Sequence, residues 1–235
     1  MSELLLVCGT GTGIGKTHFS AALLSRAARD GNVAGFKPIE SGCALWDFAS
    51  DHAQLAAAST FHVKHAPEYC LSEAVSPHLA ARNENRRIEL SRVVERVVTL
   101  AAQHRLLLVE LAGGLFSPLN ESAANVDLVR DLQRSGLKTA TVLVAPNRLG
   151  ALHDVGASTR AAAAGGVTID GIVLNAIADD DLASPSNAAE MRFVSSAPVL
   201  GLVPWQPLER LADNAEISRI YWLLLAILSR PDSSR

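Results

Sequence analysis

The sequence has few cysteines and few charged residues. Only Cys8, Cys43 and Cys70 occur among its 235 residues, and their odd number without a CxxC spacing argues against a disulfide framework and against a zinc site. This cysteine usage is typical of a reducing compartment, so we expect a cytoplasmic protein. Charged residues make up 19% of the chain, with a formal net charge of -3. That composition lacks the excess of basic residues that is typical of proteins that bind nucleic acid or anionic membranes.

Apolar runs long enough to cross a membrane are also missing. The apolar block at residues 220–228 is shorter than the roughly 20 residues of a membrane span, and we interpret it as the buried face of a helix. The chain passes from Glu3 directly into an apolar run, without the basic segment and cleavage site of a signal peptide. We therefore expect a single domain over residues 1–235, with neither a membrane nor a nucleic acid as partner.

A glycine-rich stretch follows the first apolar run. Residues 4–8 read Leu-Leu-Leu-Val-Cys, and residues 9–17 read Gly-Thr-Gly-Thr-Gly-Ile-Gly-Lys-Thr. Between a strand and a helix, this pattern directs backbone N–H groups and a helix dipole toward a phosphate. Lys16 would reach the terminal phosphates of a nucleotide, and the Thr17 hydroxyl would bind its Mg²⁺. An ordinary glycine-rich turn is the alternative, but Gly-Lys-Thr in this context favours a P-loop with one residue more than usual.

Apolar runs alternate with helical patterns along the chain. Six runs predict strands at residues 4–8, 33–38, 105–109, 139–145, 169–175 and 199–203. Helices are predicted at residues 18–29, 51–59, 89–104, 126–134, 151–164 and 214–228. Residues 39–42 and 60–77 predict irregular loops. Continuous apolar strands separated by helices indicate an α/β fold, a doubly wound and mainly parallel sheet of the P-loop NTPase type with helices on both faces.

In such a fold, ligands bind beyond the carboxyl ends of the strands, where several charged residues are predicted to lie. Glu110 ends an apolar strand and is followed by a flexible Leu-Ala-Gly-Gly loop, so we interpret it as a Mg²⁺ ligand. Asp51 opens a helix, where a metal ligand and a helix N-cap remain equal alternatives. Lys37 stands between Phe36 and Pro38, which suits a lysine that stabilises a phosphoryl group or an anionic substrate.

Four motifs, in this order, resemble the family of ATP-dependent dethiobiotin synthetases. The P-loop at residues 9–17 has that family's extra residue, and residues 37–42 read Lys-Pro-Ile-Glu-Ser-Gly, which matches its Lys-Pro-x-x-Ser/Thr-Gly signature. Residues 76–78 read Ser-Pro-His, and residues 109–114 read Val-Glu-Leu-Ala-Gly-Gly against the family's Val-Glu-Gly-Ala-Gly-Gly. Further residues fall at the family's places: Leu149, Gly150, Asn175, Pro204 and Trp205. The resemblance therefore extends over the whole chain.

The resemblance implies a ligase reaction in which diaminopelargonic acid, CO₂ and ATP give dethiobiotin, ADP and phosphate, with Mg²⁺ as cofactor. One substrate amine takes up CO₂ as a carbamate, whose oxygen attacks the γ-phosphate to form a carbamic-phosphoric anhydride. The second amine then closes the ureido ring, and phosphate leaves. Positioning and charge stabilisation supply most of such catalysis, which suits a P-loop enzyme without a covalent nucleophile.

Carried over by position, the resemblance implies a role for each motif residue. Lys16 and Lys37 stabilise the phosphoryl charge, while Thr12 and Ser41 orient the carbamate, so that Lys37, Thr12 and Ser41 contact the substrate. Mg²⁺ is held by Thr17, Asp51 and Glu110. The nucleotide contacts are Gly13, Ile14, Gly15, Lys16, Thr17, His18 and Glu110, with Asn175, Pro204 and Trp205 as the adenine pocket. A homodimer is implied, in which Gly150, Ala151 and Leu152 open a helix that binds the substrate carboxylate in the partner's site.

Two positions depart from the family. Leu111 stands where the family has a glycine beside the metal carboxylate, which predicts a crowded loop or a backbone angle that leucine tolerates poorly. Residues 149–153 read Leu-Gly-Ala-Leu-His, where the family usually has an asparagine near the histidine. The second departure affects the end of the site that would bind the substrate carboxylate, so it bears on substrate identity more than on the use of ATP.

Two other functions compete with the synthetase. A switch or partitioning ATPase of the P-loop class usually has a lysine directly after the first P-loop glycine, where this chain has Thr10, so that class fits worse. A catalytically impaired nucleotide-binding homologue is suggested by Leu111, but the retained Lys16, Lys37 and Glu110 argue against it. We therefore expect an ATP-dependent cyclo-ligase.

Overall fold

The centre of the molecule is a six-stranded sheet in the order β2-β5-β1-β6-β7-β8. The computed structural model describes residues 2–44, 47–177 and 181–230. Neighbouring strands in the sheet are parallel. The strands are β1 (Glu3–Gly9), β2 (Val33–Phe36), β5 (Leu106–Glu110), β6 (Lys138–Pro146), β7 (Gly171–Asn175) and β8 (Val199–Val203). The predicted doubly wound parallel sheet is confirmed.

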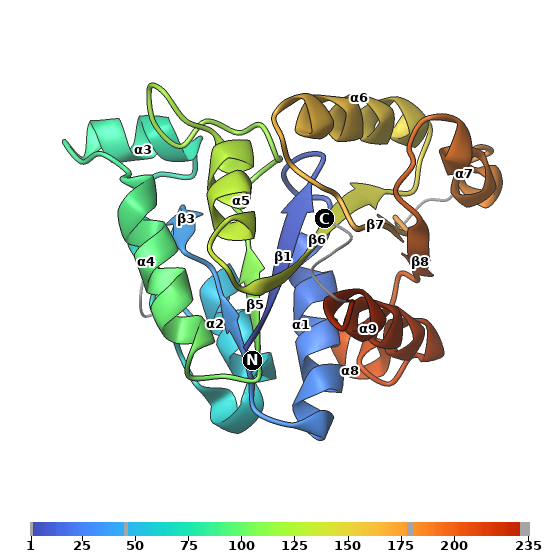
Figure 1. Cartoon of the computed structure of the whole chain (residues 1–235), viewed down its shortest axis with the longest axis horizontal. Helices are drawn as coiled ribbons and strands as arrows, with labels where there is room; N and C mark the ends of the chain where they lie inside the picture. Colours follow the sequence, from blue (N-terminus) through green and yellow to red (C-terminus); the bar gives the residue numbers. More distant parts are fainter. Residues whose placement is uncertain (1, 45–46, 178–180, 231–235) are drawn as a thin grey trace.

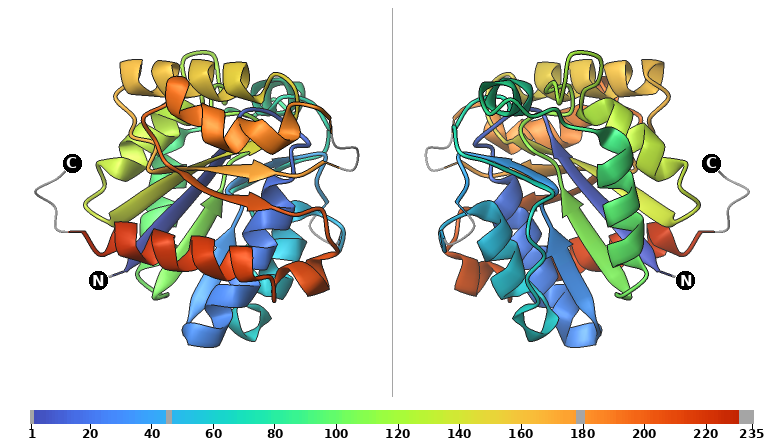
Figure 2. Two further views of the ribbon diagram at one scale, coloured as in Figure 1. Left: turned by 90° about the vertical axis from the view of Figure 1, so that its right-hand side faces the viewer. Right: turned by 90° about the vertical axis from the view of Figure 1, so that its left-hand side faces the viewer.

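Helices cover both faces of this sheet (Figures 1 and 2). One face carries α1 (Lys16–Ala27), α2 (Asp51–Ala58), α8 (Leu208–Leu211) and α9 (Ala215–Leu228). The other carries α4 (Leu90–Ala101), α5 (Asn125–Gln133), α6 (Ala151–Ala164) and α7 (Ser184–Glu190). In the left-hand view of Figure 2, the strands run between α6 and α7 above and α9 below. Short 3₁₀ helices lie at Ala28–Asp30, Thr60–His62 and Met191–Phe193.

Each face of the sheet has its own apolar core. Successive residues of a strand point to opposite faces, so Leu4 and Leu6 of β1 pack in the cluster beneath α4 and α5, whereas Leu5 and Val7 pack in the cluster beneath α1 and α9. Burial on both faces explains why these strands read as unbroken apolar runs.

The apolar block near the C-terminus is the buried face of α9, as predicted. Ile220, Leu224, Ile227 and Leu228 are buried there, and they belong to the core cluster that includes residues of α1. Among the helices in the described ranges, none combines the length and the apolar character that a membrane crossing requires.

Two segments predicted as loops contain regular structure, so these predictions are wrong. The strands β3 (Ile39–Ser41) and β4 (Tyr69–Leu71) form a separate parallel pair, and α3 (Pro77–Asn83) begins at Pro77. A three-residue strand is too short to show a periodic pattern. Proline at the first helical position is favourable because that residue's N–H has no partner within the helix, so Pro77 starts a helix here.

The cysteine pattern argues against a disulfide framework, yet the structure contains one disulfide. Cys43 and Cys70 form a disulfide, with their Cα atoms 5.5 Å apart. The pairing of β3 with β4 places Glu40 opposite Cys70, and this brings together two cysteines that are 27 residues apart. Cys8 is free and lies inside β1, where burial raises the pKa of its thiol to about 12.

Candidate active site

The glycine-rich loop joins β1 to α1 at the carboxyl edge of the sheet. Gly13 and Gly15 have φ angles of 71° and 84°, in the left-handed region that favours glycine. A Cβ on Gly15 would lie 2.7 Å from Nδ2 of Asn175. That nitrogen donates hydrogen bonds to the carbonyls of Ile14 at 2.9 Å and Gly15 at 3.0 Å. The end of β7 therefore holds the loop in shape.

A charged cluster stands beside this loop. The Nζ of Lys37 donates hydrogen bonds to Asp51 and, at 2.7 Å, to Oε1 of Glu110. The same Oε1 accepts a hydrogen bond from the Thr17 hydroxyl at 2.7 Å. These four residues come from the start of α1, the loop after β2, the start of α2 and the end of β5. The structure thus brings together the three predicted metal ligands and Lys37.

The carboxylates keep Lys37 charged although it is buried. Burial by itself would lower its pKa, but Glu110 and Asp51 outweigh that effect and raise the pKa above its ordinary value. Burial would likewise raise the pKa of Asp51, yet Lys37 outweighs it and lowers that pKa. The two groups therefore remain an ion pair around neutral pH.

The cluster fits a divalent cation with oxygen ligands. Glu110 has no exposed surface, and its Oε2 has no hydrogen-bond partner within the described ranges. A buried carboxylate oxygen without a donor is costly unless a cation satisfies it. The neighbouring hydroxyl of Thr17 and carboxylate of Asp51 complete a set of hard oxygen donors, which is the set that Mg²⁺ prefers.

Most of the predicted catalytic residues line one cavity of about 720 Å³. The loop after β1 forms one side of it, and the segments around β3 and the start of α3 form the other. The hydroxyl of Ser41 is buried at this side without a partner among the described residues. The lining includes Thr12, Gly13, Gly15, Lys16, Thr17, His18, Lys37, Ser41, Asp51, Ser76, Pro77 and Gly113.

The predicted adenine residues line a second cavity of about 760 Å³. Asn175, Pro204 and Trp205 are among its walls, and Trp205 is 69% exposed. Ile14 lies here as well, and the two cavities share Thr12, Gly13, Gly15 and His18. The glycine-rich loop is thus their common wall.

Some lining residues were not predicted from the sequence. Gln206, Pro207 and Arg148 border the second cavity, and Glu40 and Gln54 border the first. The carbonyl of Gln206 is 2.8 Å from Nε2 of His18, so the turn after β8 is joined to α1. The signal for Gln206 and Pro207 was their position next to Pro204 and Trp205.

Residues 150–152 line neither of these cavities. Gly150 caps the N-terminus of α6 with a φ of 94°, and Ala151 is buried. Their predicted place in a partner's site stays a prediction.

Leu111 does not distort the site, so the prediction of a crowded loop is wrong. Its side chain is 1% exposed and packs in the core cluster beneath α4 and α5. Its N–H donates to the carbonyl of Val7 at 2.9 Å. Leu111 is also absent from the non-glycine residues with positive φ in the described chain, which are Phe61, His62 and Asn85.

Replacing Leu111 with glycine is therefore expected to destabilise the protein. The loss of a buried leucine side chain and the added backbone freedom should lower the free energy of unfolding by about 3–5 kcal/mol. Urea denaturation measures this change, with Leu182→Gly at a fully exposed position as the control. A variant as stable as the parent chain would mean that Leu111 contributes nothing to the core.

Comparison with known proteins agrees with the observed fold. A family model described as an AAA domain matches residues 3–210. Two solved structures share the fold at 16% and 19% identity, a likeness that shows the fold alone. A ParA family ATPase from Chlorobium tepidum has a TM-score of 0.60, covering 95% of this chain and 99% of that one. A cell division ATPase MinD from Pyrococcus furiosus has a TM-score of 0.58, covering 97% and 98%.

Similarity to curated proteins shows the family to which the chain belongs. An ATP-dependent dethiobiotin synthetase of Anaeromyxobacter dehalogenans is 36% identical over 207 residues, covering 86% of this chain and 90% of its own length. That of Aromatoleum aromaticum is 38% identical over 205 residues, covering 84% and 88%. That of Pseudescherichia vulneris is 31% identical over 240 aligned positions, covering 100% and 96%. Each alignment covers most of this chain and most of the relative. The chain therefore belongs to the family of ATP-dependent dethiobiotin synthetases.

Proposed function

We propose that this chain catalyses the ATP- and Mg²⁺-dependent conversion of diaminopelargonic acid and CO₂ to dethiobiotin. The observation that carries this proposal is the pair of cavities that share the glycine-rich loop as a wall. A nucleotide lying across that loop would put its base beside Asn175 and Trp205 and its terminal phosphate beside Lys16 and Lys37. The remainder of the first cavity would then receive the second substrate, next to the phosphate that it attacks.

The residues of the first cavity would act by positioning and by charge. The oxygen of the substrate carbamate attacks the γ-phosphorus as ADP leaves, and the second amine attacks the carbamate carbon as phosphate leaves. Lys37, held charged by two carboxylates, would stabilise the charge on the transferred group. The Ser41 hydroxyl, which has no partner among the residues that the structure describes, would orient the carbamate together with Thr12. Thr17, Asp51 and Glu110 would hold Mg²⁺, which supplies charge neutralisation at the phosphates.

A coupled assay tests the proposed function. The purified protein is given ATP, Mg²⁺ and bicarbonate, with or without diaminopelargonic acid, and ADP and dethiobiotin are both measured. We expect ADP release that depends on the diamine and equals the dethiobiotin formed, and we expect both to disappear in Lys16→Ala. ATP hydrolysis that ignores the diamine would instead favour a switch or partitioning ATPase, and nucleotide binding without turnover would favour an impaired homologue.

Lys16 should make nucleotide binding depend on pH. Burial, and then the charge of Lys37, lowers its pKa to about 8, and bound phosphates would raise it again. The contribution of Lys16 to the affinity is then constant below this pKa and falls as pH rises above it, by up to about tenfold per pH unit, because binding takes up a proton. The Kd of ADP in metal-free buffer measures this slope. In Lys16→Arg the cation stays charged, so a slope as steep as that of the parent chain would contradict the assignment to Lys16.

We also propose a homodimer in which residues 150–152 serve the partner's site. The N-terminus of α6 is capped by Gly150 without a side-chain hydrogen bond. The N–H of Ala151 donates to the carbonyl of Arg148 at 3.0 Å, so the N–H groups that follow it would bind the substrate carboxylate. Mixing inactive Lys37→Met with inactive Leu152→Glu should then restore roughly a quarter of the activity, because half of the random dimers are heterodimers with one intact site. A mixture that stays inactive, although heterodimers form, would show that the site lies within one chain.

The remaining parts of the proposal concern the surroundings of the protein. We propose a cytoplasmic location, because the reaction consumes ATP. The formal net charge of -3 supports the absence of nucleic-acid and anionic membrane partners.

A further inference from the structure

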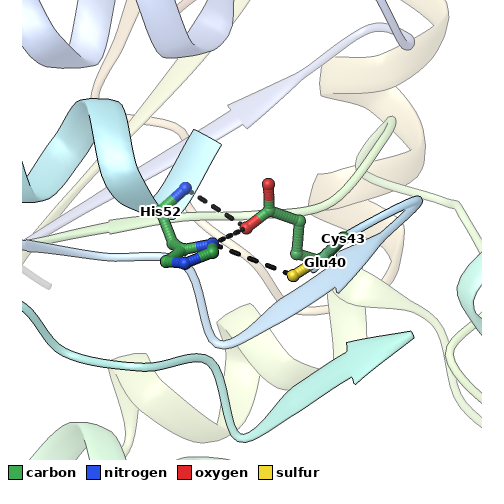
Figure 3. A group of neighbouring side chains, drawn as sticks. All are labelled: Glu40, Cys43 and His52. Carbon is green, nitrogen blue, oxygen red and sulfur yellow. Dashed lines mark hydrogen bonds and ion pairs between the residues drawn. The ribbon is translucent and has the colours of Figure 1, made fainter. Parts of the chain in front are cut away.

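A second group of chemically reactive side chains comes from the segment that carries Lys37 and Ser41 and from the start of α2. Glu40 comes from β3, Cys43 follows that strand, and His52 lies in the first turn of α2 (Figure 3). All three are buried, and their ligand atoms lie within 4.8 Å of one another. The His52 Nδ1 is 2.8 Å from Oε2 of Glu40 and 3.8 Å from Sγ of Cys43. The function proposed above uses none of them.

A further thiol stands beside this group. Cys70 of β4 is joined to Cys43 in the oxidised chain. Reduction would leave two thiols at this place, because hydrogen bonds between β3 and β4 hold the two segments together independently of the sulfur atoms. The ligand atoms of Glu40, Cys43 and His52 then lie within 4.8 Å of one another, and the thiol of Cys70 stands beside that of Cys43.

This donor set suits zinc. Structural Zn²⁺ is bound by four tetrahedral ligands at about 2.0–2.3 Å, which sets neighbouring ligand atoms roughly 3.3–3.8 Å apart. The separation of Nδ1 and Sγ already falls at that value, while Nδ1 and Oε2 would have to separate by about half an ångström. Softer thiolate ligands favour zinc over magnesium, so this group differs in kind from the oxygen donors around Glu110.

A purely structural role explains only part of the arrangement. The Glu40 carboxylate accepts hydrogen bonds from the N–H groups of Asp51 at 2.7 Å and His52 at 3.2 Å, so it stabilises the first turn of α2. That role requires neither sulfur.

We propose that the reduced chain binds one Zn²⁺ ion through Glu40, Cys43, His52 and Cys70, and that the oxidised chain does not. In the reduction by a water-soluble phosphine, the disulfide accepts two electrons and two protons and becomes two thiols. The phosphine becomes its oxide with oxygen from water. Zinc binding then releases the two thiol protons. The disulfide and the metal are alternative links between β3 and β4.

Cobalt(II) tests this proposal because its absorption reports the ligands. The full chain is reduced with the phosphine, freed of metal and titrated with Co²⁺ in the presence of saturating Mg²⁺, which occupies oxygen-donor sites. We expect one Co²⁺ per chain, with visible bands of tetrahedral cobalt and a thiolate-to-cobalt charge-transfer band, both removed by Zn²⁺. The oxidised chain should show neither band. Absence of both bands from the reduced chain, or equal bands in the oxidised chain, would overturn the proposal.

Matched variants locate the site. Cys43→Ser and His52→Gln should weaken Co²⁺ binding by more than about tenfold, and Cys43→Ser should also weaken the charge-transfer band. Cys8→Ser removes the one cysteine outside the group and should leave both unchanged. Thermal denaturation and far-ultraviolet circular dichroism establish that each variant is folded before it is titrated. Folded Cys43→Ser and His52→Gln variants that bind Co²⁺ as the parent chain does would show that the ion is held elsewhere.

Discussion

Replacing Lys37 with methionine is expected to lower the kcat of dethiobiotin formation by roughly 10²- to 10³-fold. Lys37 is 5% exposed and forms ion pairs with two carboxylates, so its charge is held at the wall of the first cavity, where the proposed function puts the terminal phosphate. Methionine preserves most of the packing of the lysine stem but removes the charge that would stabilise phosphoryl transfer. The KM for ATP should change less than kcat, because Lys16 and the loop remain. Steady-state assays of dethiobiotin formation measure both constants.

The control for this variant is Lys138→Met, at the start of β6. It removes a lysine outside the walls of both cavities, and its kcat should match that of the parent chain. The expectation fails if folded Lys37→Met keeps its kcat within about tenfold. In that case Lys37 would serve only to balance the charges of Asp51 and Glu110.

The Glu110→Gln variant should lose most of the effect of Mg²⁺ on ATP binding. Glutamine has the shape of glutamate but not its charge, so it is a poor ligand for a hard cation. The loss of about 3–4 kcal/mol of charge stabilisation would lower kcat by roughly 10²- to 10³-fold. Lys37 would still have Asp51 as a partner, which should limit the loss of stability. Isothermal titration calorimetry of ATP, with and without Mg²⁺, measures the change.

An exposed glutamate provides the comparison for Glu110. Glu95 lies on the outer side of α4, and Glu95→Gln should leave both the Mg²⁺ effect and kcat unchanged. If Mg²⁺ strengthened ATP binding equally in Glu110→Gln and in the parent chain, Glu110 would not be a metal ligand.

The main sheet could be predicted from the sequence because each of its strands carries a physical signature. Strands such as β5, buried on both faces, give unbroken apolar runs, and the turn after β1 requires glycine at positive φ. The second sheet could not be predicted, since β3 and β4 contain only three residues each. The contact between Cys43 and Cys70 depends on that strand pair, so it was missed for the same reason.

The candidate site, too, could be predicted from the sequence only in part. Glu110 and Lys37 could be predicted because each stands at the carboxyl end of a buried strand, at the edge where ligands bind. Their ion pair, and the place of Asp51 beside it, depend on the start of α2 and on side-chain rotamers that no local pattern encodes. The effect of Leu111 was misjudged because the side to which its side chain points is decided by tertiary packing in the core. The walls of the second cavity come from strand ends far apart in the sequence.

The two sides of the first cavity are attached to parts of the fold that differ in resistance to local opening. The glycine-rich loop extends from β1, which is hydrogen-bonded to β5 on one side and β6 on the other, so releasing it requires disruption of the centre of the sheet. Ser41 belongs to a separate pair of three-residue strands outside that sheet, and this pair would open at a smaller free-energy cost once its disulfide is reduced. Substrate would then enter and product leave through movements of this strand pair, while a nucleotide on the glycine-rich loop would stay in place because the centre of the sheet opens least.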